Sequence, residues 1–288
     1  MLDTKEKFVL LIDCPDTIGI VKTVSSFFYE IGAGIISSDQ HSDLDSERFF
    51  ARWEIKGFQK PLPSLEQFKS AFESIATEFD MKWDAIDANI KPKIVVAVSK
   101  TGHCLHDLLY QWKAGLLPAE IKAVVSNHEL FREQAEWYNL PYHYLPITTE
   151  TKRQQEQQIL EVMSDVGASL LVLARYMQIL SPDMCESLAG RAINIHHSFL
   201  PSFKGANPYR QAFDRGVKIT GATAHYVTTD LDEGPIIEQD VQRVSHYHSN
   251  EELVRMGADI EQRVLTRAVS WHCTNRIILN GQKTIVFR

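Results

Sequence analysis

The sequence of 288 residues has few cysteines, no excess of positive charge and no long apolar run. Its four cysteines lie far apart in the chain, and no two of them form a CxxC pair, which argues against a disulfide framework and against a zinc site. The 30 lysines and arginines are outnumbered by 37 aspartates and glutamates, giving a net charge of -7. Binding to nucleic acid or to an anionic membrane through bulk charge is therefore disfavoured.

No segment has the sequence pattern of a membrane span or of a targeting signal. The longest apolar runs, such as residues 170–174, are far too short to cross a bilayer. The N-terminus is charged and lacks the apolar region of a secretory signal. We therefore expect a cytoplasmic protein with reduced cysteines. Hydrophobic residues make up 44% and charged residues 23% of the chain, which is typical of globular proteins, and the length suits two domains.

The first 90 residues predict a small domain with a ferredoxin-like βαββαβ order. Its strands are expected at residues 8–12, 35–41 and 48–55, and its amphipathic helices at residues 18–31 and 63–79. The pattern lapses near residues 84–90, before a Lys-Pro-Lys sequence, and we place the domain boundary there, which gives domains at residues 1–90 and 91–288.

Residues 91–288 predict a doubly wound, mostly parallel α/β sheet. Uninterrupted apolar runs, expected of strands buried on both faces, alternate with helical segments. The strands are expected at residues 94–98, 120–126, 141–145 and 170–174, with helices at 105–112, 128–138 and 154–166. A strand, a helix near residues 250–272 and a hairpin turning at Asn280-Gly281 are expected to follow. In such sheets, ligands bind beyond the carboxyl ends of the strands.

Two polar clusters follow later strands. Asn194 and His196 are two residues apart, so in a strand their side chains share a face. An amide and an imidazole placed in this way can donate hydrogen bonds to a developing oxyanion, although a pair of strand-end capping residues reads equally well. The second cluster contains Asp232, which could hold an imidazolium or orient a water, or else belong to an acidic, solvated turn.

Taken in order, several motifs between Asn194 and Ile237 resemble the folate-dependent formyltransferase family. They are Asn194-Ile195-His196, Ser198-Phe199-Leu200-Pro201, Gly205-Ala206, Gly221-Ala222-Thr223-Ala224-His225 and Asp232-Glu233-Gly234-Pro235-Ile236-Ile237. The resemblance implies that Asn194, His196 and Asp232 are catalytic. It also implies a folate site formed by Met177, Gln178, Ile179 and Leu180 together with Thr228 and Leu231, although core packing would equally explain Met177 and Ile179.

Within the family, the chain is similar to the branch that hydrolyses 10-formyltetrahydrofolate to formate and tetrahydrofolate. His197 stands where formyltransferases acting on glycinamide ribonucleotide typically carry Pro, and residues 98–103 contain a single glycine, which is weak evidence for a phosphate site. The opening at residues 13–21 is similar to an ACT domain, which implies an amino-acid effector near Asp16, Gly19 and Ile20. A dimerisation module without ligand is an equal alternative.

The resemblance implies neither a metal nor a cofactor other than the folate substrate, and we expect a homo-oligomer, either a dimer or a tetramer. Gln178 occupies a position where many formyltransferases carry Arg, which leaves contacts with the glutamate tail of folate open. Two other functions remain as alternatives. One is a formyltransferase with an amine acceptor such as glycinamide ribonucleotide, and the other is a non-catalytic amino-acid sensor.

Overall fold

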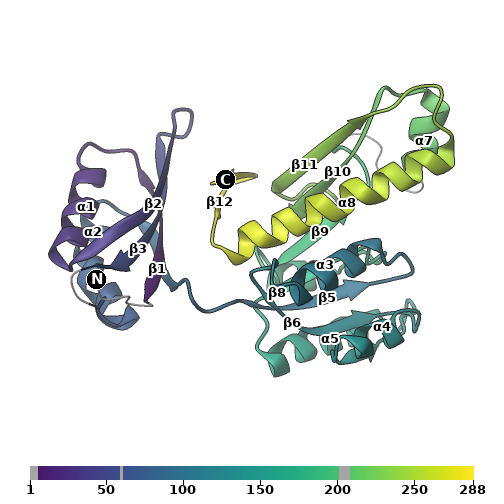
Figure 1. The fold of residues 1–288 in the computed structure, drawn as a ribbon, viewed down its shortest axis with the longest axis horizontal. Coiled ribbons are helices and arrows are strands. Elements are labelled where there is room, and N and C mark those ends of the chain that lie inside the picture. Colours follow the sequence, from purple (N-terminus) through teal and green to yellow (C-terminus); the bar gives the residue numbers. More distant parts are fainter. Residues whose placement is uncertain (1–5, 59–60, 201–207) are drawn as a thin grey trace. The chain divides into compact units, whose positions relative to one another are not determined.

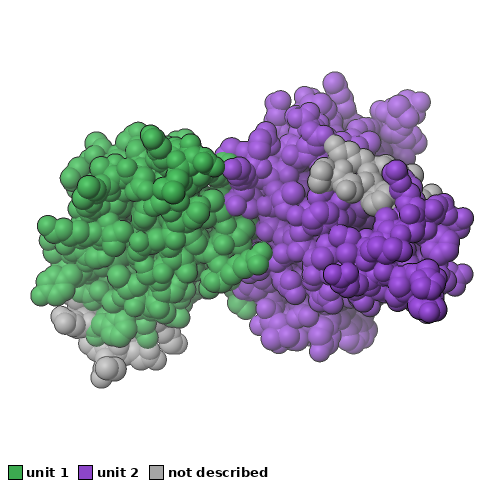
Figure 2. Space-filling view, turned by 90° about the horizontal axis from the view of Figure 1, so that it is seen from above, with its two compact units in different colours: residues 1–91, 274–280, 285–288 green, residues 92–273, 281–284 purple. Residues whose placement is uncertain are grey.

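The computed structural model describes residues 6–58, 61–200 and 208–288, which form two compact units. The first unit comprises residues 1–91, 274–280 and 285–288, and the second comprises residues 92–273 and 281–284 (Figure 2). The units therefore do not follow chain order. The segments 274–280 and 285–288 belong to the first unit, whereas the sequence analysis assigned every residue after 90 to the second domain.

The first unit is a four-stranded antiparallel sheet in the order β2-β3-β1-β4, with two helices packed on it (Figure 1). This order confirms the predicted ferredoxin-like fold. Phe27 and Phe68 meet edge to face between the helices, at a centroid distance of 5.3 Å. The elements are β1 (Lys7–Pro15), α1 (Ile20–Glu30), β2 (Ala33–Asp43), β3 (Arg48–Gly57), α2 (Leu65–Glu78) and β4 (Lys82–Asp87).

Strand β4 runs through part of the segment where the sequence pattern lapses. Ala85 is the one buried residue among its six, so the strand presents almost no apolar signal. It is held instead by antiparallel pairing with β1.

The second unit is built on a seven-stranded sheet in the order β11-β10-β9-β8-β5-β6-β7. Strands β5 to β9 pair in parallel, while β10 and β11 are antiparallel, which confirms the predicted mostly parallel sheet. Its elements are β5 (Lys93–Val98), α3 (His103–Lys113), β6 (Glu120–Ser126), α4 (Arg132–Trp137), β7 (Tyr142–Tyr144), α5 (Lys152–Val166), β8 (Leu170–Leu173), α6 (Pro182–Ser187), β9 (Ala192–His196), α7 (Pro208–Arg215), β10 (Ile219–Tyr226), β11 (Ile236–Arg243) and α8 (Asn250–Cys273). The predicted closing hairpin is present as β12 (Ile277–Asn280) and β13 (Lys283–Val286).

Helix α4 is shorter than the helix expected at residues 128–138. The hydroxyl of Ser126 accepts a hydrogen bond from the backbone N–H of His128, and the Tyr142 hydroxyl donates to the His128 carbonyl. Residues 127–131 are thereby held in a turn, so that the helix begins only at Arg132.

The strand order reverses between β5 and β8, and this reversal places the loops that follow the two strands side by side. The backbone N–H of Ser99 donates to the Arg175 carbonyl at 3.2 Å, and the Ser99 hydroxyl accepts from the N–H of Met177 at 2.9 Å. The two loops are thus tied together at the carboxyl edge of the sheet.

Between β10 and β11 the chain passes very close to the end of β10. The N–H of Tyr226 donates to the carbonyl of Pro235 at 3.0 Å, and a Cβ added to Gly234 would lie 1.8 Å from the Tyr226 carbonyl oxygen. The chain therefore requires glycine at position 234 because of this contact with the backbone.

We expect Gly234→Ala to lower the free energy of unfolding by about 1–3 kcal/mol, because the added methyl group has to displace backbone atoms. Differential scanning calorimetry would show this as a drop of several degrees in the transition of the second unit. A transition at the wild-type temperature would mean that the turn relaxes without cost, contrary to the contact described here.

Candidate active site

A cleft of about 320 Å³ opens at the carboxyl ends of β8 and β9, and we call it the main cleft. It is lined by Cys185 and by residues from three segments, which lie within 173–180, 194–197 and 225–232. The first two segments follow or end parallel strands, and the third includes the end of β10 and the loop behind it. This is the position in which a doubly wound sheet ordinarily binds its ligand.

The structure brings Asn194, His196 and Asp232 together in the main cleft. His196 is buried, and its Nδ1 lies 3.2 Å from Oδ2 of Asp232, which comes from a turn 36 residues further along the chain. Asn194 is half-buried on the same strand as His196. Their catalytic role stays a prediction, but the geometry that such a role requires is present.

The register of two antiparallel strands sets this geometry. Asn194 on β9 pairs with His225 on β10, and His196 pairs with Thr223. The turn after β10 then carries Asp232 back over the strand ends. Asp232 itself has a φ of 58°, in the left-handed region that few residues other than glycine adopt, and such strain is commonly retained at functional sites.

Two histidines keep the Asp232 carboxylate ionised. Burial by itself would raise the pKa of this carboxyl, but the hydrogen bond from His196 and the nearby ring of His225 outweigh burial and hold the pKa well below its usual range. With Nδ1 of His196 directed at Asp232, its Nε2 is buried and meets no hydrogen-bond partner among the described residues. A buried ring nitrogen of this kind needs a partner from a ligand or from water.

His225 is a member of this site that the sequence analysis did not select. Its Nδ1 lies 2.9 Å from the Tyr226 carbonyl oxygen, so Nδ1 carries the hydrogen, and Nε2 can accept from the Asn194 amide at 3.3 Å. Nε2 also lies 3.7 Å from Oδ1 of Asp232. His225 stands in one of the motifs that suggested the family, but its place beside Asn194 depends on the register of β9 and β10, which the sequence does not give.

The residues expected to bind folate all line the main cleft. Met177, Ile179 and Leu231 are 54%, 62% and 57% exposed, which is unusual for such side chains and argues against plain core packing of Met177 and Ile179. Exposed apolar groups gathered around a cleft suit an apolar or aromatic ligand. Gln178, Leu180 and Thr228 are half-buried between them.

Of the three residues expected at an effector site, Asp16 and Gly19 lie between β1 and α1 of the first unit, and Ile20 is the first residue of α1. Asp16 is exposed, and Gly19 has a φ of 106° directly before α1. Ile20 is 2% exposed and packs in the core of this unit, so its side chain is not available to a ligand.

Two of the motifs used in the sequence analysis, Gly205-Ala206 and the Pro201 end of the preceding one, lie outside the described residues.

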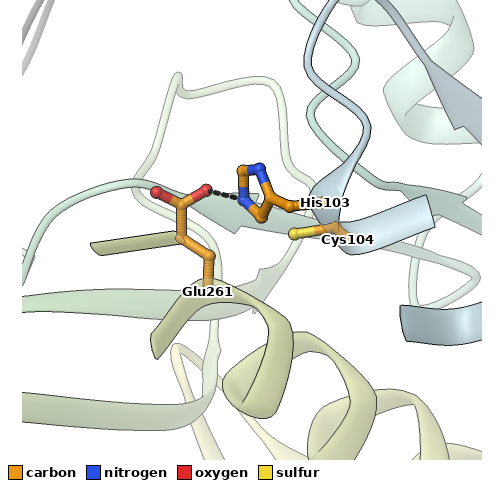
Figure 3. Close-up of side chains that lie close together, drawn as sticks. All are labelled: His103, Cys104 and Glu261. Atoms are coloured by element: carbon orange, nitrogen blue, oxygen red, sulfur yellow. Dashed lines mark hydrogen bonds and ion pairs between the residues drawn. The ribbon is translucent and has the colours of Figure 1, made fainter. Parts of the chain in front are cut away.

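Within the described residues, one group has side chains that could hold a metal ion: His103 and Cys104 at the start of α3, and Glu261 on α8 (Figure 3). Two of its members, His103 and Glu261, already pair with each other. The Glu261 carboxylate accepts from Nε2 of His103 at 2.7 Å and from the Tyr209 hydroxyl, and burial raises the pKa of the Cys104 thiol well above its usual value. The arrangement therefore suits a hydrogen-bonded network better than a metal centre.

Across the described parts of the chain, no helix has the length and apolar character needed to cross a membrane.

Comparison with known proteins agrees with this geometry. Residues 92–269 match the family model described as formyl transferase. The chain is 48% identical to a formyltetrahydrofolate deformylase of Bacillus subtilis over 286 residues, a match that covers 98% of this chain and 94% of that protein. The crystal structure of formyltetrahydrofolate deformylase from Burkholderia mallei superposes with a TM-score of 0.93 at 47% identity, and the match covers 98% of this chain and 100% of that one.

A formyltransferase with a different printed name matches less of the chain. Glycinamide ribonucleotide transformylase 1 from Symbiobacterium toebii superposes with a TM-score of 0.65 at 28% identity, and the match covers 69% of this chain and 95% of that one. The deformylases thus share both units with this chain, whereas the transformylase leaves about a third of it unmatched. The chain belongs to the formyltransferase family and, within that family, to the formyltetrahydrofolate deformylases.

Proposed function

We propose that this protein hydrolyses 10-formyltetrahydrofolate to formate and tetrahydrofolate. The observation that carries the proposal is the buried, unpartnered Nε2 of His196, which lies in the main cleft while Asp232 occupies the other ring nitrogen. The similarity to deformylases over 98% of the chain supports the same reaction.

The main cleft has the chemistry of a folate site. The pterin is a flat aromatic ring system with polar edges, and it suits apolar walls against its faces with a few polar anchors at its edges. Met177, Ile179 and Leu231 provide exposed apolar walls, while backbone groups around Thr228 and the Gln178 amide can bind polar edges. The formyl group would then lie where Asn194, His196 and Asp232 converge.

Attack of water on the formyl carbon forms a C–O bond and moves the carbonyl electron pair onto oxygen. With a proton on each ring nitrogen, His196 donates Nδ1–H to Asp232 and Nε2–H to the oxyanion, and the Asn194 amide donates the second hydrogen bond. Donors of this kind contribute roughly 2.7–4 kcal/mol each to transition-state stabilisation. His225 holds the Asn194 amide in place by accepting from it.

The Asp232 carboxylate, which its lowered pKa keeps ionised at neutral pH, orients the attacking water and receives the proton that this water gives up once the C–O bond forms. When the tetrahedral intermediate collapses, the C–N bond breaks and its electron pair goes to the folate nitrogen, which takes the proton held by Asp232. Formate leaves as the anion. The net reaction consumes one water and releases one proton.

The roles of the first unit and of other copies of the chain also belong to this proposal. An amino-acid effector near Asp16 and Gly19, a dimer or tetramer, and a cytoplasmic location would fit a regulated enzyme of one-carbon metabolism. All four cysteines are free and buried, which fits a reducing compartment.

We expect the purified protein to release formate from 10-formyltetrahydrofolate in buffer that contains no amine. A coupled formate assay, together with the absorbance change of the folate, would measure both products in equal amounts. Turnover that begins only after an amine acceptor such as glycinamide ribonucleotide is added would overturn the hydrolase and favour the transferase.

We expect His196→Asn and Asp232→Asn each to lower kcat by about 10²–10⁴-fold, because each removes a group that acts on the transition state. Glu233→Gln is the matched control, since it neutralises the exposed neighbouring carboxylate, and we expect it to keep kcat within about twofold. Circular dichroism and thermal unfolding would establish that all three variants fold. Preserved turnover in a folded Asp232→Asn protein would remove Asp232 from the mechanism.

A further inference from the structure

A second cavity of about 280 Å³ lies in the same unit, next to the main cleft, and neither folate binding nor the catalytic residues account for it. Its walls include His103, Tyr209 and Glu261, and it shares Arg175 and His197 with the main cleft. The ring of His197 is centred 5.3 Å from that of His196. The second cavity therefore begins one side chain away from the reacting group.

Arg175 is the most unusual residue in the wall between the two cavities. It is not a glycine, yet it has a φ of 63°, a strained conformation that the protein retains at the end of β8. Its side chain is 13% exposed, and within the described residues neither Nε nor Nη1 meets a hydrogen-bond acceptor. A guanidinium keeps its charge at any pH of interest, so unmet donors at a cavity wall favour a planar anion.

The carboxylate of Glu261 partly offsets the positive charge of Arg175. The carboxylate is 1% exposed, and its Oε2 lies 3.5 Å from Nε of Arg175, too far for a normal hydrogen bond. Burial would raise the pKa of Glu261, but contacts with His103, Arg175 and Tyr209 lower it, so the group stays ionised. An anion bound at Arg175 therefore feels a nearby negative charge and is held weakly.

His197 completes the wall as a neutral group. Burial and the adjacent Arg175 charge lower its pKa to about 4, so at neutral pH one ring nitrogen donates and the other accepts. A neutral imidazole can donate to a small carboxylate on either side of the wall without adding a charge that would trap it.

We propose that the second cavity binds formate at the Arg175 guanidinium and is the route by which this product leaves while tetrahydrofolate still occupies the main cleft. The source of the formate rests on the proposed function, whereas the binding site does not. Formate matches the guanidinium in charge and in its two parallel oxygens, and the cavity is far larger than formate, so water can enter as formate departs.

The test is direct binding of ¹³C-formate to the free enzyme, measured by NMR line broadening in chloride-free buffer. Arg175→Met should raise the formate dissociation constant by at least about tenfold, because the charged donors are lost. The dissociation constant of Arg175→Lys should lie between those of Arg175→Met and wild type, because lysine keeps the charge but not the planar pair of donors. Glu261→Gln should lower the constant by about threefold or more, because the opposing charge is removed while hydrogen bonding is kept.

Arg210→Met is the matched control. Arg210 also lines the second cavity, but its side chain is 62% exposed and pairs with Asp214, so we expect less than about a twofold change. Thermal unfolding would establish that each variant is folded, and Arg175→Lys serves if Arg175→Met is not. The proposal is overturned if wild type does not bind formate, if Arg210→Met weakens binding while the folded Arg175 variant does not, or if Glu261→Gln weakens it.

Product inhibition separates this proposal from the proposed function. If the protein hydrolyses the substrate, formate should inhibit wild type and lose at least about tenfold in potency against Arg175→Met. Formate binding that depends on Arg175, without hydrolysis, would uphold the site and overturn the function. Hydrolysis without formate binding would uphold the function and overturn the site.

Discussion

The candidate active site depends on one half-buried carboxylate that lies between two histidines. Asp232 faces Nδ1 of His196 through one oxygen and Nε2 of His225 through the other. This arrangement fixes the orientation of the His196 ring and leaves its Nε2 for the substrate. His225, beside Asp232, also contacts the Asn194 amide. Without Asp232, the His196 ring would lose the partner of its Nδ1, whereas His225 would keep its contact with the Tyr226 carbonyl and with the Asn194 amide.

Holding this carboxylate requires most of the surrounding fold. Its burial opposes ionisation, so the two imidazoles must lie within a few ångströms to compensate. They do so because β9 and β10 pair in a register that sets His225 beside Asn194. The turn that delivers Asp232 closes only because Gly234 has no side chain to meet the Tyr226 carbonyl. Because the sheet changes from parallel to antiparallel pairing at β10, His225 lies beside Asn194, and the turn after β10 brings Asp232 to both histidines.

In the proposed mechanism, the two cavities separate the large folate from two small molecules, the reactant water and the product formate. The main cleft has exposed apolar walls suited to folate, and the second cavity has a buried guanidinium suited to an anion. Arg175 and His197 form the wall between them. An enzyme that uses water in place of a larger acceptor gains from such a division, because water and formate can pass beside the reacting carbon without displacing the folate.

The sequence by itself determined much about this protein. Apolar runs and helical periodicity gave both sheets, because burial of alternating or continuous apolar residues is a local property of the chain. The motifs between Asn194 and Ile237 indicated the family and the residues Asn194, His196 and Asp232. Strand β4 was not clearly predicted from the sequence, because Ala85 is its one buried residue and its apolar pattern is weak.

Tertiary structure decided the remainder, because contacts between distant segments leave no local signal. Nothing near His225 in the sequence shows that it faces Asn194, since strand register is set by the whole sheet. Arg175 looks like an ordinary residue after a strand until its positive φ, its burial and its place between two cavities are seen together. Likewise, only the folded chain shows that residues 274–280 return to the first unit and that Glu261, on the last long helix, meets His103 at the start of α3 (Figure 3).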